Sequence, residues 1–573
     1  MSPEFPSPGR PNRSTATRRT ILKGSLGSMA TLALGAPAIA ALAGCSSKKS
    51  GKVSNASEVK LPAYIPQTAV KADLAAGRNG APPGYFSYPA DPADTVKKPP
   101  LGGTTISAIT NLFLPPPPGA GSNKAWQGIE KRLGGSVKFQ MVGSDDYATK
   151  LSTVIAGGDL PDVMTFLGLG AQSGIQDAPG FLESKCQDLT DALGGDAVKD
   201  YPNLANIPTV FWEQCTVAGK LWFVPIPRNI SAGAGFVHRE LVTKAGLKST
   251  AELDSTEKLK SFFKEVTDKG KNRYALGASK DSYYANQTFY QTFGVPNQWK
   301  KSGDTIISQY DTDEFVQAVE FMAELHAAGY YFPGSEGWTK AQLQDAYQSG
   351  RICTMYDGFP SLVNPYWQSM PKINKSFKPG MFMPPGLNGR TPTTYADNIN
   401  FAYTMLKKAD SGHLKKVLGL LNFLAAPFGS SEYLLINYGV KGADYTVDAQ
   451  HNPVLTDRGT RETAVPWKYL AAGPQVLYDP GHKDFVEYAH PVMKTIVSEA
   501  VKDPTAGAYS PTYAEKYQSI SQTLTDSVSD IIAGRKPTST LKSAVQKWKS
   551  GGGDKIAHEF AEALSPKKST ATS

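Results

Sequence analysis

Histidine side chains are a natural starting point in a search for metal or acid–base chemistry, and here they are spread singly along the chain. None of them forms an HExxH motif or another spacing that would place two metal ligands together. Each is expected to be a surface or packing residue, so the sequence predicts no metal site. The seven are His238, His326, His413, His451, His482, His490 and His558.

Paired carboxylates would be required by an enzyme that cleaves carbohydrates, because one acts as an acid and the other as a base or nucleophile. Asp145 and Asp146 are better placed to cap a helix that begins near Tyr147. Asp159 and Asp162 flank a Leu-Pro pair at the entry to a predicted strand. Such pairs occur in any large protein, so we assign no catalytic residue.

Loops that serve nucleophiles or cofactors are also missing from the sequence. No GxSxG elbow occurs. Gly168-Leu169-Gly170 follows a predicted strand, but the third glycine falls at Gly174, one place too late for a dinucleotide loop. We therefore expect a protein that is not an enzyme and that holds no cofactor.

The cysteines leave two alternatives open. Besides Cys45 there are only Cys186, Cys215 and Cys353, and none of them forms a CxxC motif. Outside a cell, Cys186 and Cys215 could form one disulfide and leave Cys353 unpaired. Three buried free thiols are equally compatible with the sequence.

The first 45 residues have the pattern of an export signal. Arg18 and Arg19 form a twin-arginine pair, an uncharged stretch follows, and Leu42-Ala43-Gly44-Cys45 ends it. The last four residues resemble a bacterial lipobox, in which the cysteine is acylated (for example with palmitate) after cleavage just before it. Residues 1–44 are then a Tat signal peptide, and Cys45 anchors the protein on the outer face of the cell membrane. The alternative is a plain membrane-spanning helix, since about 20 apolar residues can cross a bilayer.

The composition of the remaining 529 residues is that of a folded protein. The chain is 40% hydrophobic and 10% aromatic, which allows two or three domains with large cores. Without residues 1–44 it has 55 basic and 50 acidic side chains, a formal charge of +5. This small excess and the lack of a basic stripe exclude nucleic acid as a partner. No second apolar run of about 18 residues occurs, so we expect a soluble, tethered body.

The N-terminal part of the mature chain is predicted to lie outside the main fold. Residues 45–60 are rich in Ser, Lys and Gly and are predicted to form a flexible tether. Residues 61–100 are rich in Pro and Gly and carry scattered aromatics. They suggest an extended arm that wraps over a domain, with a disordered spacer as the alternative. The folded body starts near Leu101.

The body alternates short apolar runs with helical patterns, which favours an α/β architecture with largely parallel sheets. One amphipathic stripe runs from Leu259 to Val266 and stops at Gly270. A second, around Phe315, has Asp311 and Glu314 as expected caps, and a third spans residues 414–424. The expected strands are Thr105–Ile109, Val137–Met141, Asp162–Leu167, Leu221–Ile226, Gly235–His238, Ile352–Tyr356 and Phe401–Leu406.

One segment carries a family resemblance. Residues 151–164 contain Ala-Gly-Gly-Asp-Leu-Pro-Asp-Val, in which a helix ends, a turn follows and a strand begins. This resembles the signature of the family 1 extracellular solute-binding proteins, the receptors of ABC sugar importers. Further stretches resemble elements of that family in the same order, from residue 101 to 562. They are Asp188–Asp191, Val217–Pro225, Phe236–Leu247, Tyr347–Met355 and Met383–Gly386, and for the LplA-type lipoprotein subgroup Phe423–Gly429, Leu435–Gly442 and Asn452–Thr456.

The resemblance implies a two-lobed α/β clamp of the type II periplasmic-binding-protein class with crossed hinge connections. The N-lobe would comprise residues 101–230 and 402–480, and the C-lobe residues 233–397 and 485–573. Pro227–Ala232 and Asn398–Phe401 would form the hinge, where small residues can absorb backbone rotation. The implied partners are a sugar or oligosaccharide, an ABC permease and the membrane through a lipid anchor, with the receptor itself a monomer.

The resemblance also places the ligand in loops between the lobes. Aromatic side chains would contact the face of a sugar ring, and Asp, Asn, Gln or Arg its hydroxyls. Core packing is the alternative for Trp126, Tyr283 and Phe359, strand capping for Asp162, and a structural ion pair for Arg228. The predicted binding residues are Asn111, Trp126, Asp162, Phe166, Arg228, Asn229, Tyr283, Tyr284, Asn286, Gln287, Asp357, Gly358, Phe359, Trp367, Tyr395, Asp397 and Asn398.

Two other classes of function remain as alternatives. An exported carbohydrate-active enzyme, a hydrolase or lyase, would turn over its ligand, whereas a receptor returns it unchanged. A structural or adhesive surface lipoprotein would bind no small ligand and would not close. Abundant aromatics and few clustered charges favour sugars over peptides as the solute.

Overall fold

The computed structural model describes most of the chain from residue 59 onward. Met1–Gly51 form a unit separate from Lys52–Ser573. The expected signal peptide, Cys45 and most of the expected tether lie outside the described residues. The described residues are 59–67, 70–113, 115–144, 146–167, 175, 177–228, 233–391, 393–396, 399–506 and 508–565.

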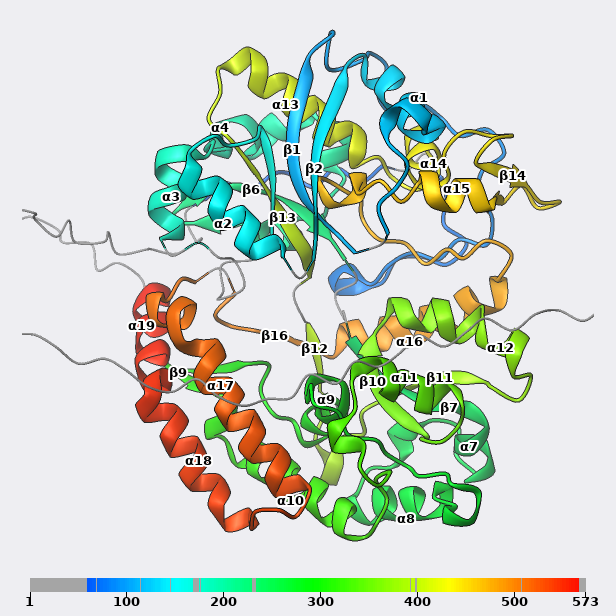
Figure 1. Cartoon of the computed structure of the whole chain (residues 1–573), viewed down its shortest axis with the longest axis vertical. Coiled ribbons are helices and arrows are strands. Elements are labelled where there is room, and N and C mark those ends of the chain that lie inside the picture. Colours follow the sequence, from blue (N-terminus) through cyan, green and yellow to red (C-terminus); the bar gives the residue numbers. More distant parts are fainter. Residues whose placement is uncertain are drawn as a thin grey trace, which may run out of the picture. The chain divides into compact units, whose positions relative to one another are not determined.

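The first sheet has five strands in the order β2-β1-β3-β13-β6 (Figure 1). β13 is antiparallel to both of its neighbours, and the other two pairings are parallel, so β1, β2, β3 and β6 all run in the same direction. β3 and β6 are buried at every residue, whereas β2 at one edge of the sheet exposes Lys138 and Gln140. Their bounds are β1 Thr105–Leu112, β2 Ser136–Gly143, β3 Val163–Phe166, β6 Phe223–Pro227 and β13 Asn400–Leu406.

Helices that cover the first sheet have clear local signals at their ends. In α1 (Lys124–Leu133), the Asn123 side chain accepts a hydrogen bond from the backbone N–H of Trp126. Gly134 ends the helix with φ +64°, a conformation that favours glycine. In α13 (Ser411–Leu424), Asp410 caps the first turn and the expected leucine stripe is buried.

The second sheet has three strands in the order β10-β7-β11, namely Thr354–Gly358, Gly233–His238 and Pro379–Phe382. Both outer strands are antiparallel to β7. The expectation of largely parallel sheets is therefore correct for the first sheet and wrong for the second. The mixture of helices and sheets confirms the α/β class.

Several helix ends differ from the sequence prediction. α8 (Thr256–Val266) stops four residues before Gly270 because Asp268 pairs with Arg273 and folds the chain back. α10 (Asp313–Ala327) is capped by the hydroxyl of Thr312 and not by Asp311 or Glu314. Asp146 precedes α2 (Tyr147–Gly157), but its carboxylate makes no capping hydrogen bond.

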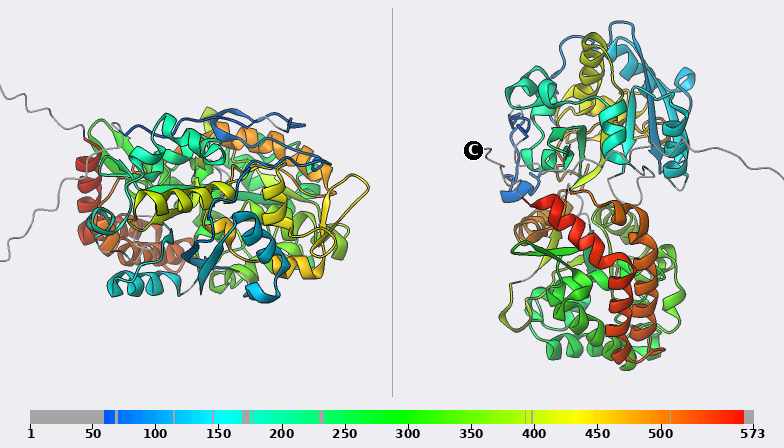
Figure 2. Two further views of the ribbon diagram at one scale, coloured as in Figure 1. Left: turned by 90° about the horizontal axis from the view of Figure 1, so that it is seen from above. Right: turned by 90° about the vertical axis from the view of Figure 1, so that its left-hand side faces the viewer.

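The C-terminal helices α17 (Pro511–Ile532), α18 (Leu541–Trp548) and α19 (Asp554–Leu564) pack on one another, as both views of Figure 2 show in orange and red. The remaining elements are α3 Ala178–Lys185, α4 Thr190–Leu193, α5 Pro202–Ala205, α6 Thr209–Trp212, α7 Arg239–Lys244, α9 Tyr283–Phe293, α11 Lys340–Gln348, α12 Met370–Ile373, α14 Ser431–Tyr438, α15 Asp457–Glu462, α16 Lys483–Ser498, β4 Thr216–Val217, β5 Lys220–Leu221, β8 Trp299–Ser302, β9 Thr305–Ser308, β12 Thr394–Ala396, β14 Tyr445–Val447, β15 Pro453–Leu455 and β16 Ala500–Lys502.

Residues 61–100 lie along the body with little regular structure. Early in this arm, the backbone N–H of Ile65 donates to the Ala205 carbonyl at 2.8 Å. Further along, the Tyr88 hydroxyl donates to the Ser430 carbonyl at 2.7 Å. Between these points the arm contacts α16, where His490 Nε2 lies 2.9 Å from the Ala75 carbonyl oxygen. The arm therefore touches elements that belong to widely separated parts of the sequence.

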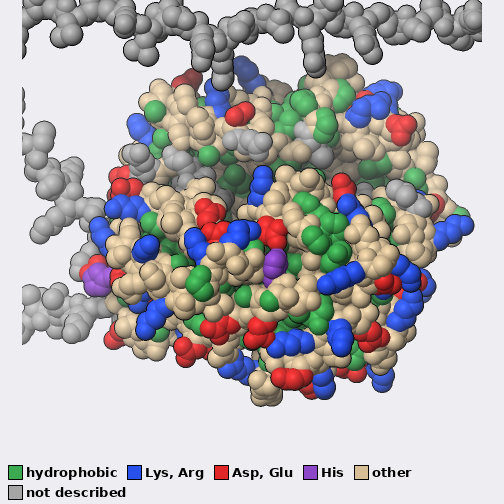
Figure 3. Space-filling view, turned by 60° about the horizontal axis from the view of Figure 1, so that its bottom comes forward, with side chains coloured by type: hydrophobic (Ala, Val, Ile, Leu, Met, Phe, Trp, Pro, Cys, Tyr) green, Lys and Arg blue, Asp and Glu red, His purple; other side chains and the backbone are tan. Residues whose placement is uncertain are grey.

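The surface and the cysteines show no feature of metal or redox chemistry within the described residues. Cys186, Cys215 and Cys353 are buried free thiols, and burial raises the pKa of Cys186 and Cys353 to about 12. On the face in Figure 3, basic and acidic side chains are interspersed, without a large patch of either sign. Among the described helices, none is both long and apolar enough to cross a bilayer.

Candidate functional site

The chain passes between the two sheets at one edge of the first sheet. The carboxyl ends of β1, β3 and β6 lie at this edge, where β13 begins. From Pro227 the chain runs through residues 228–232 to Gly233, the first residue of β7. Five residues span at most about 18 Å. Groups at the carboxyl edge of the first sheet and at the start of β7 are thus held near one another, and carboxyl edges of α/β sheets are common ligand sites.

Three aromatic rings gather at this edge and form what we call the ring shelf: Phe113, Phe401 and Tyr469. Phe401 stacks on Tyr469 with ring centroids 5.0 Å apart and an interplanar angle of 28°. Phe113 meets both rings edge-on, at 5.5 and 5.3 Å, and is 46% exposed. An exposed phenylalanine on a rigid aromatic base is a ready contact surface for an apolar ligand face.

Two cations flank the ring shelf. The Arg228 guanidinium carbon lies 5.6 Å from the Phe401 ring centroid, and the Lys468 ammonium 5.4 Å from that of Tyr469. Within the described residues, neither cation forms an ion pair with a carboxylate. A cation that rests on a ring face keeps its N–H donors available for a ligand.

Asn111 lies on β1 beside the shelf, and its side chain is completely buried. Neither Oδ1 nor Nδ2 has a hydrogen-bond partner within the part of the chain that the structure describes. A buried amide without partners costs about 1 to 3 kcal/mol. Such a group is expected where a ligand later satisfies it.

On the side of the second sheet, tyrosine rings crowd around Gly233. Tyr283, in the first turn of α9, contacts Tyr284 at 5.3 Å and Tyr356 at 5.2 Å between ring centroids. A Cβ on Gly233 would lie 2.6 Å from the hydroxyls of both Tyr283 and Tyr356. Only glycine allows this close approach, so the rings are held at the point where the chain enters β7.

Asp357 is fully buried at the end of β10 and is bound by protein groups. Its carboxylate lies 2.9 Å from the Lys340 ammonium and accepts a hydrogen bond from the Gln344 amide at 2.7 Å. Burial alone would lower the pKa of Lys340, but the hydrogen bond and charge of Asp357 outweigh it and raise that pKa. Lys340 also lies 4.7 Å from the Tyr284 ring centroid. Asp357 therefore positions the cation and the ring, and Gly358 follows it opposite Gly233.

The two amides of α9 differ in their environment. The Asn286 amide donates to the Tyr290 hydroxyl at 3.5 Å inside the helix packing. Gln287 Oε1 is buried and has no partner within the described residues. Gln287 is therefore the better candidate of the two for a ligand contact.

Two aromatic residues predicted at the site lie in the packing of the first sheet, which corrects their placement. Trp126 is 7% exposed and packs edge-on against Phe139 and Trp467. Phe166 is 1% exposed and stacks on Phe223. Both apolar rings therefore pack in the core. Core packing is an alternative to ligand binding for any aromatic side chain.

Asp162 lies at the wrong end of its strand. It precedes β3 and accepts hydrogen bonds from the Ser107 N–H and hydroxyl at 2.8 and 2.7 Å, while His413 Nε2 is 3.0 Å away. Burial would raise the pKa of Asp162, but these hydrogen bonds lower it overall. Because the carboxyl edge is at the opposite end of β3, Asp162 is a structural cap.

Three aromatic residues on the other side also serve packing. Phe359 is 2% exposed. Trp367 stacks on Tyr488 of α16 at 5.2 Å, and its indole N–H donates to Asp484 at 3.1 Å. Tyr395 is 4% exposed, and its hydroxyl donates to the Val295 carbonyl at 2.9 Å. Asn229, Asp397 and Asn398 lie outside the described residues.

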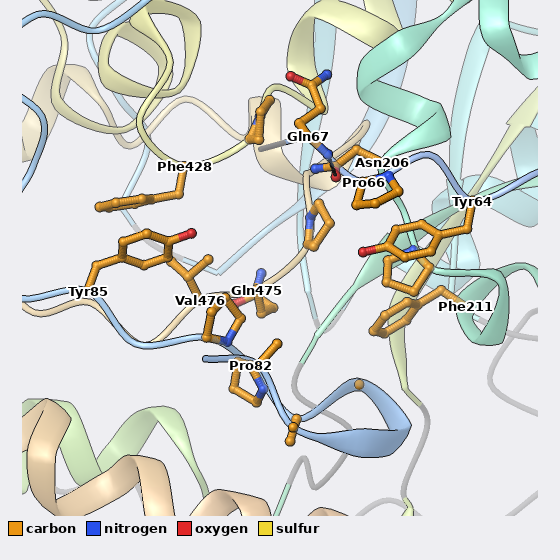
Figure 4. Close-up of a pocket in the computed structure, with 18 of the residues that line it drawn as sticks. Tyr64, Pro66, Gln67, Pro82, Tyr85, Asn206, Phe211, Phe428, Gln475 and Val476 are labelled. Carbon is orange, nitrogen blue, oxygen red and sulfur yellow. Dashed lines mark hydrogen bonds between the residues drawn. The ribbon is translucent and has the colours of Figure 1, made fainter. Parts of the chain in front are cut away.

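A hollow that we call the arm pocket lies between the arm and the first-sheet side (Figure 4) and has a volume of about 360 Å³, with Arg228 among its lining residues. Prolines and aromatic rings dominate its lining, and Tyr85 lies 4.3 Å from Phe428 between ring centroids. Its amides are largely engaged, since Gln67 bonds to Asn203 and Asn206 at 2.7 and 2.8 Å. The arm pocket is therefore best explained by how the arm is fixed to the body.

The sequence analysis missed the ring shelf apart from Arg228 beside it. Phe113 directly follows β1, and its position after a predicted strand was a usable signal. Phe401 was predicted only as a strand and hinge residue. Tyr469 and Lys468 come from a short 3₁₀ turn, Trp467–Tyr469, without a regular pattern. Only the fold brings this turn to the sheet, where its backbone accepts hydrogen bonds from Thr165 and Thr404.

The sequence matches the bacterial extracellular solute-binding protein family over residues 116–428. The polygalacturonan/rhamnogalacturonan-binding protein YtcQ of Bacillus subtilis strain 168 is 23% identical over 474 residues, which cover 81% of this chain and 92% of the relative. Lipoprotein LipO of the same organism is 21% identical and covers 80% of this chain and 91% of its own length.

Solved structures of low sequence identity share the fold. A solute-binding protein from Bifidobacterium longum infantis, described as binding HMO, superposes with a TM-score of 0.59 at 13% identity over 81% of this chain and 98% of its own. The N-glycan transport solute-binding protein NgtS from Streptococcus pneumoniae gives 0.57 at 16% identity over 80% and 98%. These similarities confirm the expected two-lobed binding-protein fold.

Proposed function

Since the chain belongs to the family of bacterial extracellular solute-binding proteins, we propose that its solute is a sugar or oligosaccharide, which it delivers to an ABC importer. The family assignment also makes it a binding protein rather than an enzyme. The observation that carries the proposal is the exposed ring shelf at the point where the chain crosses between sheets. The names of relatives that bind polygalacturonan or transport N-glycan point to the same class of ligand.

The chemistry of a sugar matches the groups that meet at the crossing. A sugar ring has an apolar face, and burying it on Phe113 contributes about 25 cal/mol per Å². Its hydroxyls need hydrogen-bond partners, each worth about 0.5 to 1.5 kcal/mol net. Asn111 and Gln287 have unused amide atoms within the described residues, and they come from the two sides of the crossing. A ligand that satisfies both favours the closed arrangement of the lobes.

The proposed lobes follow the crossings of the chain. Residues 101–230 and 402–480 would move as one body, and residues 233–397 and 485–573 as the other. The segments that rotate would include Pro227–Ala232 and Asn398–Phe401. Binding energy that is gained only when both bodies touch the ligand sets how strongly the closed state is favoured.

We also propose that the protein is exported by the Tat route and anchored through a lipid on Cys45. The twin-arginine pair and the lipobox-like sequence support this, and a relative carries the name lipoprotein. Cys45→Ala should release the protein from the membrane fraction into the medium and abolish incorporation of labelled palmitate. Retention of label by the variant would contradict an anchor at this residue.

Thermal unfolding of the purified mature protein against a saccharide library tests the ligand class. A saccharide at about 100 times its Kd should add about 2.7 kcal/mol of stability. Small-angle scattering with that saccharide should show a smaller radius of gyration, and the saccharide should be recovered chemically unchanged. Stabilisation by peptides alone would overturn the sugar assignment, and conversion of the saccharide would favour the hydrolase or lyase alternative.

A further inference from the structure

The charges around the ring shelf carry information about the ligand beyond its being a sugar. Arg228 and Lys468 lie on neighbouring rings of one stacked pair, Phe401 and Tyr469. Neither has a carboxylate partner among the described residues. Elsewhere at the crossing the cations are neutralised: Lys340 pairs with Asp357, and Lys502 with Glu213 at 3.0 Å.

Lys468 is a cation beside the Tyr469 ring, 5.4 Å from its centroid. The side chain remains accessible to solvent. Yet the surrounding protein removes enough water to lower the pKa of its ammonium group. A positive charge kept partly dehydrated without a counter-ion is unfavourable unless an anion binds there.

Arg228 is fixed in place by its backbone and by the ring below it. Its N–H donates to the Ile399 carbonyl at 2.9 Å, which ties the first crossing to the second. Because the guanidinium rests on Phe401, its donors remain free for the planar, bidentate recognition of a carboxylate. The exposed ring of Phe113 is edge-on to the same pair and offers the apolar contact surface.

Asp503, just after β16, is an acidic group near the second crossing that forms no ion pair in the described structure. Its carboxylate instead accepts hydrogen bonds from the N–H and hydroxyl of Thr505 at 2.8 and 2.7 Å. Burial raises its pKa to about 6. These local hydrogen bonds occupy the carboxylate, so it is not a partner of either cation.

We propose that the ligand is an acidic oligosaccharide, with a uronate ring on Phe113 and its carboxylates bound by Arg228 and by Lys468, each at its own ring. This proposal rests on the proposed sugar-binding function and narrows it. A carboxylated pyranose has the required combination of an apolar ring face and an anionic group in the plane of the ring. A neutral sugar would leave both cations without a counter-charge.

The test compares two ligands that differ only at their carboxyl groups, tetragalacturonate and its fully methyl-esterified counterpart. Titration calorimetry with the intact mature protein should give at least about tenfold tighter binding for the acid, since hydrogen bonds to a carboxylate are charge-assisted. The preference should shrink as sodium chloride is raised, because salt screens exposed charges. This comparison requires no variant and so does not depend on a variant's folding.

Substitutions then assign the effect to residues. Arg228→Gln and Lys468→Gln should each weaken binding of the acid by roughly tenfold and leave binding of the ester nearly unchanged. Lys483→Gln is a matched control, because Lys483 also lies over a ring, Phe86, at 4.7 Å but on α16 beside the arm. It should leave the affinity for both ligands unchanged.

The outcomes separate this proposal from the broader one. Equal or tighter binding of the ester, or binding only of neutral oligosaccharides, would contradict the proposal of an acidic ligand. The proposed sugar-binding function would still hold. Equal losses for acid and ester in both glutamine variants also overturn the acidic ligand, because charge would then not be recognised. If no saccharide of either kind binds, the proposed sugar-binding function itself fails.

Discussion

At the scale of single residues, the most informative group is the buried amide of Asn111. It is placed on a rigid parallel strand, yet its polar atoms have no partner in the described chain. Buried polar groups in folded proteins are nearly always hydrogen-bonded. An exception at a crossing between sheets is best understood as a contact kept for a ligand.

Asn111→Ala is therefore expected to separate binding from stability. Removing the amide should leave the free energy of unfolding of the empty protein unchanged or raise it by up to about 1 kcal/mol, because an unsatisfied group is lost. The same variant should weaken saccharide binding about tenfold or more. Urea unfolding and calorimetry measure the two effects.

Asn123 provides the matched control, as it is equally buried but fully bonded. It accepts from the Trp126 N–H at 2.9 Å and donates to the Glu462 carbonyl at 2.9 Å. Asn123→Ala should cost about 1 to 2 kcal/mol of stability. If Asn111→Ala destabilises the empty protein as much as this control, the interpretation of Asn111 is wrong.

Asp162 is expected to act on stability through pH and not on binding. Its folded-state pKa is lowered, so the ionised form is favoured in the native state. The ionised carboxylate therefore stabilises the protein at pH values above the unfolded-state pKa of about 4. This stabilisation is lost as the pH falls through the lower pKa of the folded state. Asp162→Asn should destabilise the protein at pH 7 and have a smaller effect at pH 3, measured by urea unfolding, with saccharide affinity unchanged at pH 7.

A loss of affinity in Asp162→Asn without a loss of stability would contradict this assignment. Sequence reasoning placed Asp162 at the entry to its strand but left binding and strand capping open as alternatives. The direction of β3 within the sheet, which decides whether Asp162 faces the crossing, depends on pairing with β1, a contact that no local pattern encodes. The same limit applies to Trp126 and Phe166, since an apolar ring suits a core and a binding surface equally.

At the scale of elements, the arm depends on one buried carboxylate. Glu432 is 0% exposed and accepts hydrogen bonds from the N–H groups of Thr95 and Val96 at 3.1 and 3.0 Å. Arg132 of α1 lies 2.8 Å from it. One side chain thus joins the end of the arm, α14 and α1.

Glu432→Gln should destabilise the protein by about 2 to 4 kcal/mol, because Gln offers fewer acceptors and leaves Arg132 without its buried partner. Proteolysis within residues 61–100 should become faster, which mass spectrometry of the fragments can follow. Glu487→Gln serves as the control, since Glu487 forms an exposed ion pair with Lys483. This substitution should change the free energy of unfolding by less than about 0.5 kcal/mol. Unchanged cleavage of the arm in Glu432→Gln would contradict its role.

Elements with strong local patterns were predictable, and those fixed by distant contacts were not. The leucine stripe of α13 and the strand β1 follow from periodicity and burial. The antiparallel pairing of β10 and β11 with β7 does not, because the same apolar strands can pair in either direction. The ring shelf as a group was not predictable for a similar reason, since Phe113 lies far along the sequence from Phe401 and Tyr469.

At the scale of the whole molecule, the crossing segments decide how the protein closes. The two sides are linked by the crossing segments of the chain and also by an exposed ion pair. This pair lies between Lys502, after the second crossing, and Glu213, near β6. Both side chains are about half exposed, so the pair contributes at most about 1 kcal/mol. Lys502→Ala should change saccharide affinity by less than about fivefold. Calorimetry showing a larger change would mean that this pair holds the two sides together.

The ordered start of the arm sets a limit on the reach of the receptor. From Leu61 onward the backbone is hydrogen-bonded to the body, through Gly195 and Ala205. With an acyl chain on Cys45, as proposed, residues 45–60 form the tether. Even when fully extended, this tether spans no more than about 60 Å. The start of the body would stay within that distance of the lipid surface, so hand-over of a captured solute would take place with a permease in the same patch of membrane.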